Sequence, residues 1–216
     1  MVFMSLQTDF ICSAALTIQS AIISHKPEIE TLDQAIGDGD HYINVLRGAE
    51  AIANMTDELA SLTPDEALNK IAMKLLSTVG GAAGPLFASL FLGMAKVAKH
   101  NGANTTLDIA AAFAGGVQEL IKRGKGKVGE KTMLDVLVPV AHTFIFSAIE
   151  NKSTSDICAD IKTAADKGLE STRDLIATRG RAAGLGERSK GHLDAGAKSC
   201  QVMINEICYL ILKSNT

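Results

Sequence analysis

Three carboxylates are crowded into one short stretch of the chain. Asp33, Asp38 and Asp40 fall within eight residues, and His41 follows them directly. Acids at this spacing repel one another unless a cation compensates their charge, and carboxylate oxygens are the ligands that Mg²⁺ and Ca²⁺ prefer. A solvated turn is the alternative, because Asp and Gly are ordinary turn residues. The stretch therefore predicts either a site for a divalent cation or an exposed turn.

An EF-hand does not fit this acidic stretch. In a loop that starts at Asp38, the sixth position requires Gly but holds Ile43, and no Glu closes the loop. Mg²⁺ paired with phosphate fits better, since this ion takes few carboxylates and completes its shell with water and phosphate oxygens. His41 then has three open roles, as a base, as a donor to phosphate or as a helix cap. The other four histidines have no clustered partners and are expected to be structural or solvent-facing.

Two further stretches are rich in glycine. Ser77–Pro85 contains small residues ahead of a predicted helix, whose first N–H groups can bind an anion, and a tight interhelical turn is the alternative. Gly124–Thr132 has the glycines of a P-loop, but Glu130 stands between Gly129 and Lys131 and no strand pattern precedes it. A Walker A motif is therefore excluded.

A long polar and basic stretch, Gly180–Ala197, interrupts the apolar helical pattern near the end of the chain. Loops longer than about 12 residues in compact domains are commonly lids or binding loops. The arginines and lysines of this stretch can meet phosphate, and a disordered surface loop is the alternative.

Composition excludes several classes of partner. The 216 residues carry 21 Lys+Arg and 24 Asp+Glu, and a net charge of -3 is too small for a nucleic-acid footprint or a membrane-binding basic face. Aromatic residues make up 4%, which leaves little for stacking on single-stranded nucleic acid. We expect neither nucleic acid nor a membrane as a partner.

The remaining composition points to a cytoplasmic protein. The four cysteines show no CxxC spacing, so they are expected to be reduced. The first residues lack the positive region of a signal peptide, and no stretch reaches the roughly 18 apolar residues of a membrane-spanning helix.

Apolar residues recur at i, i+3 and i+4 with almost no alternating runs, so the predicted fold class is all-α. The third predicted helix has a clear start, because Thr63 and Glu66 have capping-box spacing and Pro64 occupies the first helical position. Pro27 is placed in a loop, and Pro139 predicts a kink. About eight helices are predicted, over residues 5–25, 41–59, 64–78, 85–100, 106–123, 132–150, 154–178 and 195–213.

Short connections between these helices favour antiparallel neighbours in one domain, residues 1–216, arranged as an up-and-down bundle or a closed barrel. The glycine clusters follow every second helix, so they are expected at the same end of the molecule. These clusters occupy residues 37–40, 80–84, 124–129 and 180–196.

Together, in this order and at this spacing, these residues resemble the L subunit of dihydroxyacetone kinases, which also occurs as the C-terminal nucleotide-binding domain of single-chain kinases. Four motifs in the same order are far more specific than any one of them, and they extend over most of the chain. The matching parts are 32–41 with Asn44 and Arg47–Gly48, 77–87, 123–124 with 129–136, and 180–192.

The resemblance implies a closed barrel of about eight antiparallel amphipathic helices with the nucleotide at one rim. It makes Asp33, Asp38 and Asp40 the ligands of two Mg²⁺ ions that bridge the nucleotide phosphates, and Arg181 the catalytic cation that balances the transferred phosphoryl charge. The residues that it places at ADP or ATP are His41, Tyr42, Ile43, Asn44, Ala82, Ala83, Gly124, Met133, Arg181, Asp194, Ala195 and Gly196.

The resemblance also implies a sequence of phosphoryl transfers. ADP stays bound as a coenzyme, and a phosphohistidine carrier, the M subunit, phosphorylates it. The ATP formed in place phosphorylates dihydroxyacetone, or a related hydroxyketone, held covalently by the K subunit. On this interpretation the chain supplies metal, charge and position, and a homodimer is compatible with it.

Three positions depart from the family pattern. Tyr42 replaces a usual Gly, so its phenol could crowd the nucleotide or stack against it; Ala83 stands where a Ser is common; and Asp194–Gly196 lacks a usual Pro. The intact carboxylates are expected to preserve metal–phosphate chemistry better than nucleotide affinity. The alternative function, favoured by Tyr42, is a divergent non-catalytic paralogue that senses nucleotide or binds a regulator. A purely structural bundle would leave the acids and the basic loop without a purpose.

Overall fold

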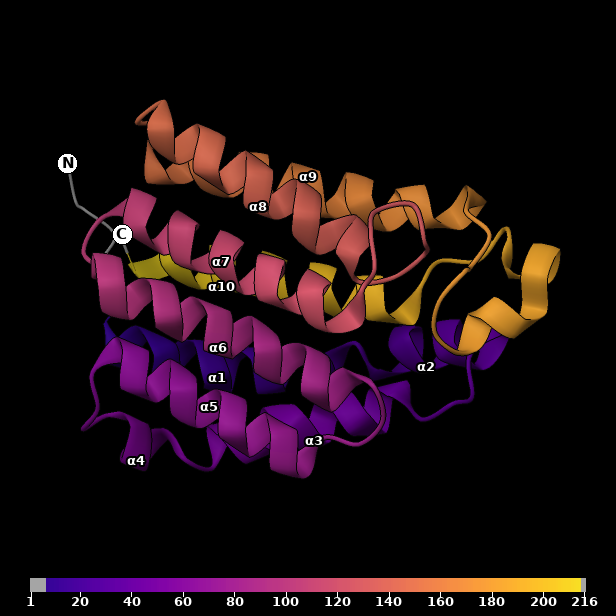
Figure 1. The fold of residues 1–216 in the computed structure, drawn as a ribbon, viewed down its shortest axis with the longest axis horizontal. Coiled ribbons are helices and arrows are strands. Elements are labelled where there is room, and N and C mark those ends of the chain that lie inside the picture. Colours follow the sequence, from indigo (N-terminus) through magenta and orange to yellow (C-terminus); the bar gives the residue numbers. More distant parts are fainter. Residues whose placement is uncertain (1–6, 215–216) are drawn as a thin grey trace.

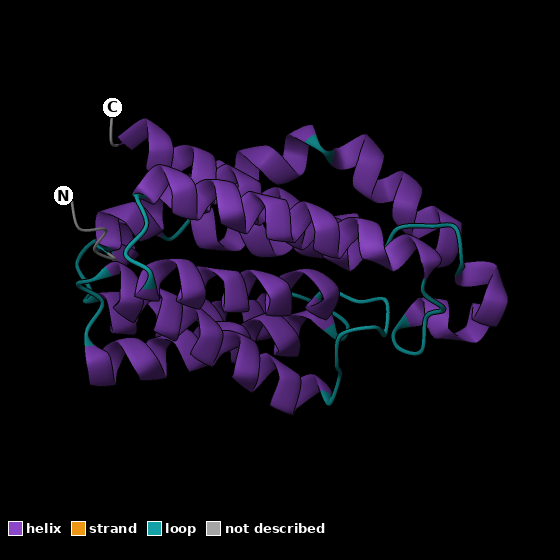
Figure 2. Ribbon diagram, turned by 90° about the horizontal axis from the view of Figure 1, so that it is seen from above, coloured by secondary structure: helices purple, strands orange, loops and turns teal. Residues whose placement is uncertain are grey.

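The computed structural model describes residues 7–214, which contain helices and turns and no strand (Figures 1 and 2). The all-α prediction is therefore confirmed. The helices are α1 (Thr8–Ser24), α2 (Lys26–Ile36), α3 (His41–Ala53), α4 (Thr56–Leu59), α5 (Pro64–Thr78), α6 (Ala83–Asn101), α7 (Thr106–Gly124), α8 (Leu134–Ile149), α9 (Thr154–Ser171) and α10 (Ala195–Ser214), with 3₁₀ turns η1 (Thr172–Asp174) and η2 (Arg181–Ser189).

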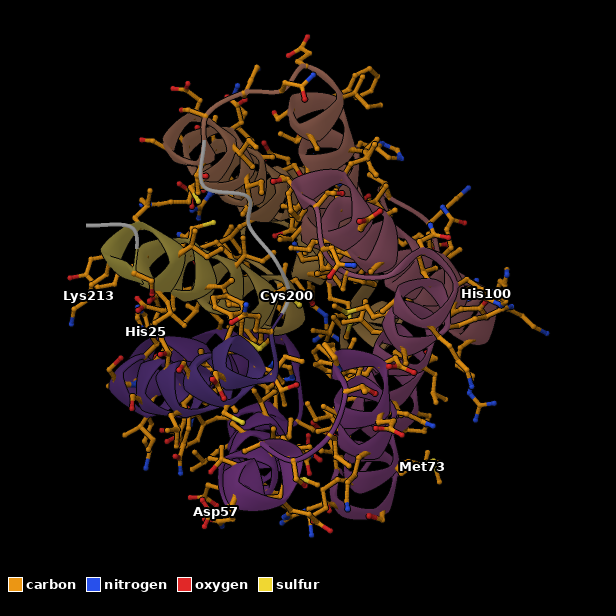
Figure 3. All side chains as sticks on the ribbon, turned by 90° about the vertical axis from the view of Figure 1, so that its left-hand side faces the viewer. His25, Asp57, Met73, His100, Cys200 and Lys213 are labelled. Carbon is orange, nitrogen blue, oxygen red and sulfur yellow. The ribbon has the colours of Figure 1, made fainter. Side chains whose placement is uncertain are left out.

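Eight long helices pack side by side around a shared core. Each contacts the next in the order α1, α3, α5, α6, α7, α8, α9, α10, and α10 contacts α1, so the ring of contacts closes. Figure 3 looks along these helices from the end that carries both termini. The expected barrel of eight helices fits this arrangement, with α2 and α4 as additional short helices.

The core depends on small residues as well as large ones. Buried Leu, Ile and Val side chains fill the ring, and alanines occupy many of the positions between helices. At the contact between α6 and α7, an added Cβ on Gly93 would lie 2.7 Å from the carbonyl oxygen of Gly115. An added Cβ on Gly116 would lie 2.6 Å from the carbonyl oxygen of Leu90. The two helices can therefore approach this closely only because these positions lack a side chain.

Helix boundaries differ from the sequence prediction at three places. Pro27 lies in the first turn of α2 and not in a loop, because a proline is well tolerated at the start of a helix. The helix predicted over 41–59 is interrupted at Asn54 and Met55, and the one predicted over 154–178 ends at Ser171. The predicted capping box is confirmed, since the Thr63 N–H donates to the Glu66 carboxylate at 3.0 Å.

Helix α8 runs through Pro139. Proline has no N–H for the carbonyl four residues earlier, which belongs to Asp135. Gly168 of α9 packs against that carbonyl, and an added Cβ there would lie 2.4 Å from its oxygen. The kink expected at Pro139 stays a prediction.

The loops with functional interest gather at one end of the ring. In Figure 1 the end of α2, the loop before α8 and the η2 segment lie at the right, and both termini lie at the left. The stretch 180–196, for which a disordered loop was the alternative, contains the 3₁₀ turn η2. All four cysteines are free thiols. No helix in the part of the chain that the structure describes is long and apolar enough to cross a membrane.

Replacing Gly116 by Ala tests the close approach of α6 and α7. Alanine favours helix by about 1 kcal/mol over glycine, but its methyl group would collide with backbone of α6, so we expect a net loss of about 1–3 kcal/mol in the free energy of unfolding. Urea denaturation measures this loss. Gly184→Ala is the control, because no atom lies within 4 Å of an added Cβ there. Equal stability of the two variants would contradict the packing argument.

Candidate functional site

A cavity of about 510 Å³ opens at the end of the ring where the glycine-rich junctions meet. All four junctions singled out in the sequence contribute to its wall, so their expected convergence on one rim is confirmed. The wall contains Asp33, Gly37, Asp38, Asp40, His41, Ala82, Ala83, Leu86, Gly124, Gly126, Thr132, Met133, Arg179, Gly180, Arg181, Asp194, Ala195 and Gly196, among others.

The three acids of the first motif come together in this wall. Asp33 is buried in the last turn of α2, whereas Asp38 and Asp40 are exposed, and one carboxylate oxygen from each lies within 4.8 Å of the others. Gly37 makes this possible, because an added Cβ would lie 1.8 Å from a carboxylate oxygen of Asp33. Gly39 adopts a φ of 79°, which favours glycine. The cluster offers three oxygen donors to one divalent cation or more.

A cation of the protein itself already faces this cluster. The guanidinium of Arg181 pairs with Asp38, with 2.7 Å between Nε and Oδ2. Arg181 opens η2 directly after Gly180, whose φ is 65°. The Arg181 side chain is 72% exposed, so it has room to move away from Asp38. Arg181 and a bound metal ion would therefore compete for the same carboxylate.

His41 begins α3 and has a defined environment. Its backbone N–H donates to Asp33 at 3.0 Å, and its Nε2 lies 2.7 Å from Oγ of Ser199 on α10. Since the Ser199 hydroxyl donates to the Ala195 carbonyl oxygen, we infer that it accepts from a protonated Nε2. Burial lowers the pKa of the His41 imidazole. The His41 ring is therefore neutral and held in place. This arrangement favours a positioning role for His41.

The three residues after His41 do not line the cavity with their side chains. Tyr42 is buried in a separate apolar cluster with Ile22, Ile29 and Val45, so its phenol neither crowds nor stacks on a ligand in the cavity. That expectation was wrong because the helical turn directs Tyr42 toward α1 and α2. Ile43 is exposed. Tyr42 and Ile43 belong to the first turn of α3, whose backbone N–H groups lack intrahelical acceptors.

Asn44 also lies outside the cavity wall. Its amide oxygen accepts a hydrogen bond from Arg47 at 3.4 Å. The same oxygen lies 3.2 Å from the position that a Cβ of Gly80 would occupy. Asn44 therefore connects α3 with the glycine-rich turn at the end of α5.

The turn before α6 brings another helix start to the cavity. Ala82 and Ala83 lie in the wall, and α6 begins at Ala83. Gly84 has no room for a side chain, since an added Cβ would lie 2.2 Å from the Val79 carbonyl oxygen. Because the first residues of α6 line the cavity, the positive end of this 19-residue helix faces it.

Two carboxylates accept backbone hydrogen bonds in the loop before α8 and at the start of α10, which form the other parts of the cavity wall. Asp135 accepts from the N–H groups of Gly129 at 2.6 Å and Thr132 at 2.7 Å, which shapes the loop that carries Met133. Asp194 accepts from the Ala197 N–H at 2.7 Å and so caps α10. Burial raises the pKa of the Asp194 carboxyl to about 6.

Several residues of this region were missed by reasoning from sequence. Arg179 and Thr132 line the cavity, and Ser199 holds His41 from a position 158 residues away. Thr132 stands in the excluded P-loop pattern and in the matching stretch 129–136, but it was not singled out as a site residue. Ser199 carried no signal, because nothing local connects it to the acidic motif.

Comparisons with known proteins agree with the resemblance. The model of the family described as the DAK2 domain matches residues 35–209. The chain is 38% identical over 184 residues to PEP-dependent dihydroxyacetone kinase 1, ADP-binding subunit DhaL, of Listeria innocua, covering 84% of this chain and 85% of that protein. It is 37% identical over 190 residues to the PEP-dependent dihydroxyacetone kinase ADP-binding subunit DhaL of Escherichia coli, covering 88% and 90%.

A solved structure shares the fold. The crystal structure of the dihydroxyacetone kinase from C. freundii in complex with AMP-PNP and Mg²⁺ matches with a TM-score of 0.73 and 19% sequence identity. The match covers 97% of this chain and 35% of that chain, so this chain spans about a third of the larger protein.

Replacing Arg181 by Gln tests the competition for Asp38. Loss of an exposed ion pair is worth about 0.5–1 kcal/mol, so we expect nucleotide-free protein to bind Mg²⁺ about two- to fivefold more tightly. Calorimetric titration of MgCl₂ measures this. Arg179→Gln is the control, because Arg179 pairs with Glu130 at 3.4 Å and not with the acidic cluster. An unchanged affinity in the Arg181 variant would show that the pair does not compete with the metal.

Asp194→Asn tests the raised carboxyl pKa. A folded pKa of about 6, against an ordinary value of 3.8, means that the folded protein takes up a proton as the pH falls from 6 toward 4. The stability of the original chain should therefore rise relative to the variant over that window, by on the order of 2 kcal/mol. Asn still caps the helix. Urea denaturation of both proteins between pH 4 and 7 measures the difference, and a constant difference would contradict the raised pKa.

Proposed function

The chain belongs to the DAK2 domain family, and we propose that it is the ADP-binding subunit of a PEP-dependent dihydroxyacetone kinase, a phosphotransferase. It holds ADP or ATP with two Mg²⁺ ions in the rim cavity. It passes phosphate from a phosphohistidine carrier to dihydroxyacetone, or a related hydroxyketone, on a partner subunit. The observation that carries this proposal is the meeting of three carboxylates and Arg181 in the wall of a cavity of about 510 Å³.

The donor chemistry of the acidic cluster fits Mg²⁺. Asp38 and Asp40 are exposed, and Asp33 uses Oδ2 to accept from the His41 N–H, which leaves Oδ1 free. Two divalent ions would account for three acids in one place. Bound Mg²⁺ would neutralise phosphate charge and hold the phosphates for transfer. Arg181, released from Asp38, would add a mobile positive charge beside the phosphates.

The cavity wall divides into a part for phosphates and a part for a base. Helices α3 and α6 begin at the wall, and the N–H groups of their first turns favour phosphate oxygens. Leu86, Leu120 and Met133 supply an apolar part that suits the flat face of a nucleobase. Gly124 and Gly126 let a ligand approach the backbone closely. His41 lies in the cavity wall, where it is neutral and held by Ser199, so it adds no charge to the site.

The chain contributes position and charge to the transfer. Among the described residues that line the cavity there is no Ser or Cys, and the His41 Nε2 is occupied by Ser199. The phosphoryl donor and the final acceptor would then both come from outside, as expected for a subunit that works with an M-type phosphocarrier and a K-type substrate-binding subunit. The alternative of a non-catalytic sensor depended on Tyr42, whose phenol is buried away from the cavity.

Calorimetric titration of ADP into the metal-free chain, with and without Mg²⁺, tests the proposal. We expect binding that depends on Mg²⁺, and we expect Asp38→Ala to weaken it by about 100-fold or more, roughly 3 kcal/mol, because a metal ligand is lost. The helical content should be unchanged, because the substitution removes an exposed carboxylate from a group of like charges that repel one another.

The control is Asp57→Ala. Asp57, which Figure 3 labels, is an exposed acid near the end of the molecule that carries the termini, far from the cavity. This variant should bind Mg²⁺ and ADP like the original chain. Normal binding by Asp38→Ala, or no binding by the folded original chain, would contradict the proposed function.

A further inference from the structure

One lysine of the cavity wall is buried where lysines rarely are. Lys131 is 1% exposed and is among the largest fully buried side chains of the described residues. Its backbone adopts a φ of 60°, in the left-handed region that few non-glycine residues enter. A buried ammonium is costly unless every N–H finds an acceptor, so this position must be held by strong contacts.

The contacts of Lys131 are three backbone carbonyl oxygens. Its ammonium donates to Thr172, Leu175 and His192, all within 3.2 Å, which satisfies all three N–H groups. Thr172 and Leu175 lie where the chain leaves α9, and His192 lies where it returns toward α10. Lys131 therefore joins both ends of the segment 175–192, which we call the rim segment.

The rim segment carries the cationic side of the cavity. Arg181 and Gly180 lie within it, and Arg181 faces Asp38 across the cavity wall. Its other contacts to the loop before α8 are closer to solvent: Arg179 donates to the Lys125 carbonyl oxygen at 2.7 Å and pairs with Glu130. Water can replace such exposed contacts, whereas Lys131 is only 1% exposed, so water competes much less for its carbonyl partners.

The neighbours of Lys131 hold it in its unusual conformation. Asp135 accepts hydrogen bonds from the N–H groups of Gly129 and Thr132, which lie on either side of Lys131 in the sequence. Thr172, fully buried, offers its carbonyl oxygen to Lys131 and its hydroxyl oxygen to the Asp194 N–H at 3.1 Å. The loop before α8, the rim segment and the start of α10 thus meet at one buried ammonium.

We propose that Lys131 is a positioning residue of the nucleotide site, which holds the rim segment so that Arg181 faces the acidic cluster and the bound phosphates. This inference rests on the proposed function for the ligand used in its test. The acidic cluster belongs to α2, α3 and their junction, whereas the hydrogen bonds of the Lys131 ammonium all go to the two ends of the rim segment. Removing the ammonium should therefore release the rim segment and weaken nucleotide binding while leaving the metal ligands in place.

The test compares Lys131→Met with Lys127→Met, the same change at an exposed lysine of the same loop. Met keeps the length of the side chain and the left-handed strain of residue 131. Trypsin cleavage after Arg179, Arg181 and Arg188 in the rim segment should become about tenfold faster in Lys131→Met and stay unchanged in Lys127→Met, since cleavage follows the population of the opened segment. Unchanged cleavage in Lys131→Met would overturn the proposal.

A double-mutant cycle with Arg181→Gln separates positioning from a general structural role. The affinity for ADP in the presence of Mg²⁺ should fall about tenfold in Lys131→Met, and adding Arg181→Gln should then cost less than about twofold, although it costs more in the original chain. The affinity for Mg²⁺ alone should not fall. Additive effects of the two changes, or loss of Mg²⁺ binding in a folded variant, would overturn the proposal.

Two controls keep these outcomes distinct. If the original chain binds no ADP, the proposed function is contradicted. If the original chain binds ADP and Lys131→Met shows the same cleavage rate and ADP affinity, only the role proposed for Lys131 is contradicted. Should Lys131→Met not fold, Lys131→Arg is measured in its place. Its planar group cannot donate to three convergent carbonyl oxygens as a point-like ammonium does, so cleavage should still rise severalfold. Unchanged cleavage and ADP affinity in Lys131→Arg would contradict the proposal.

Discussion

Repulsion among three carboxylates is the constraint around which this end of the molecule is organised. Asp33, Asp38 and Asp40 bring one oxygen each to within 4.8 Å of the others, which is unfavourable unless positive charge is nearby. The protein supplies part of that charge from Arg181 and part from the start of α3. A divalent cation can supply the rest. The same repulsion among the three carboxylates therefore favours binding of metal and of the phosphates that accompany it.

The ring of helices and the rim segment have different tasks. The ring, with its glycine contacts and small side chains, is tightly packed and fixes where α2, α3 and α6 begin and end. The rim segment buries Ala177 and Ala182 against Ile36 of α2 and also depends on polar contacts, among which the Lys131 ammonium joins its two ends. Binding residues on a loop held by a rigid scaffold can respond to a ligand without disturbing the core.

Prediction from sequence succeeded where the signal is local. The helical period, the capping box at Thr63 and glycines after every second helix were enough to predict an all-α bundle or barrel with its glycine-rich loops at one end, and the family resemblance implied the closed barrel. It failed at α2, because Pro27 in the first turn of a helix has the same local pattern as Pro27 in a loop. It also extended one helix past Ser171, where the chain turns to make tertiary contacts that no local pattern specifies.

The sequence by itself determined which chemistry is available: three acids at one junction, glycines beside helix starts, and a basic stretch before the last helix. Only the tertiary structure decided where the side chains point. It directed Tyr42 into an apolar cluster, joined His41 to Ser199 and buried Lys131 against carbonyl oxygens of the rim segment. The helical period specifies which residues share a face, but which neighbour covers that face depends on packing between elements far apart in the chain.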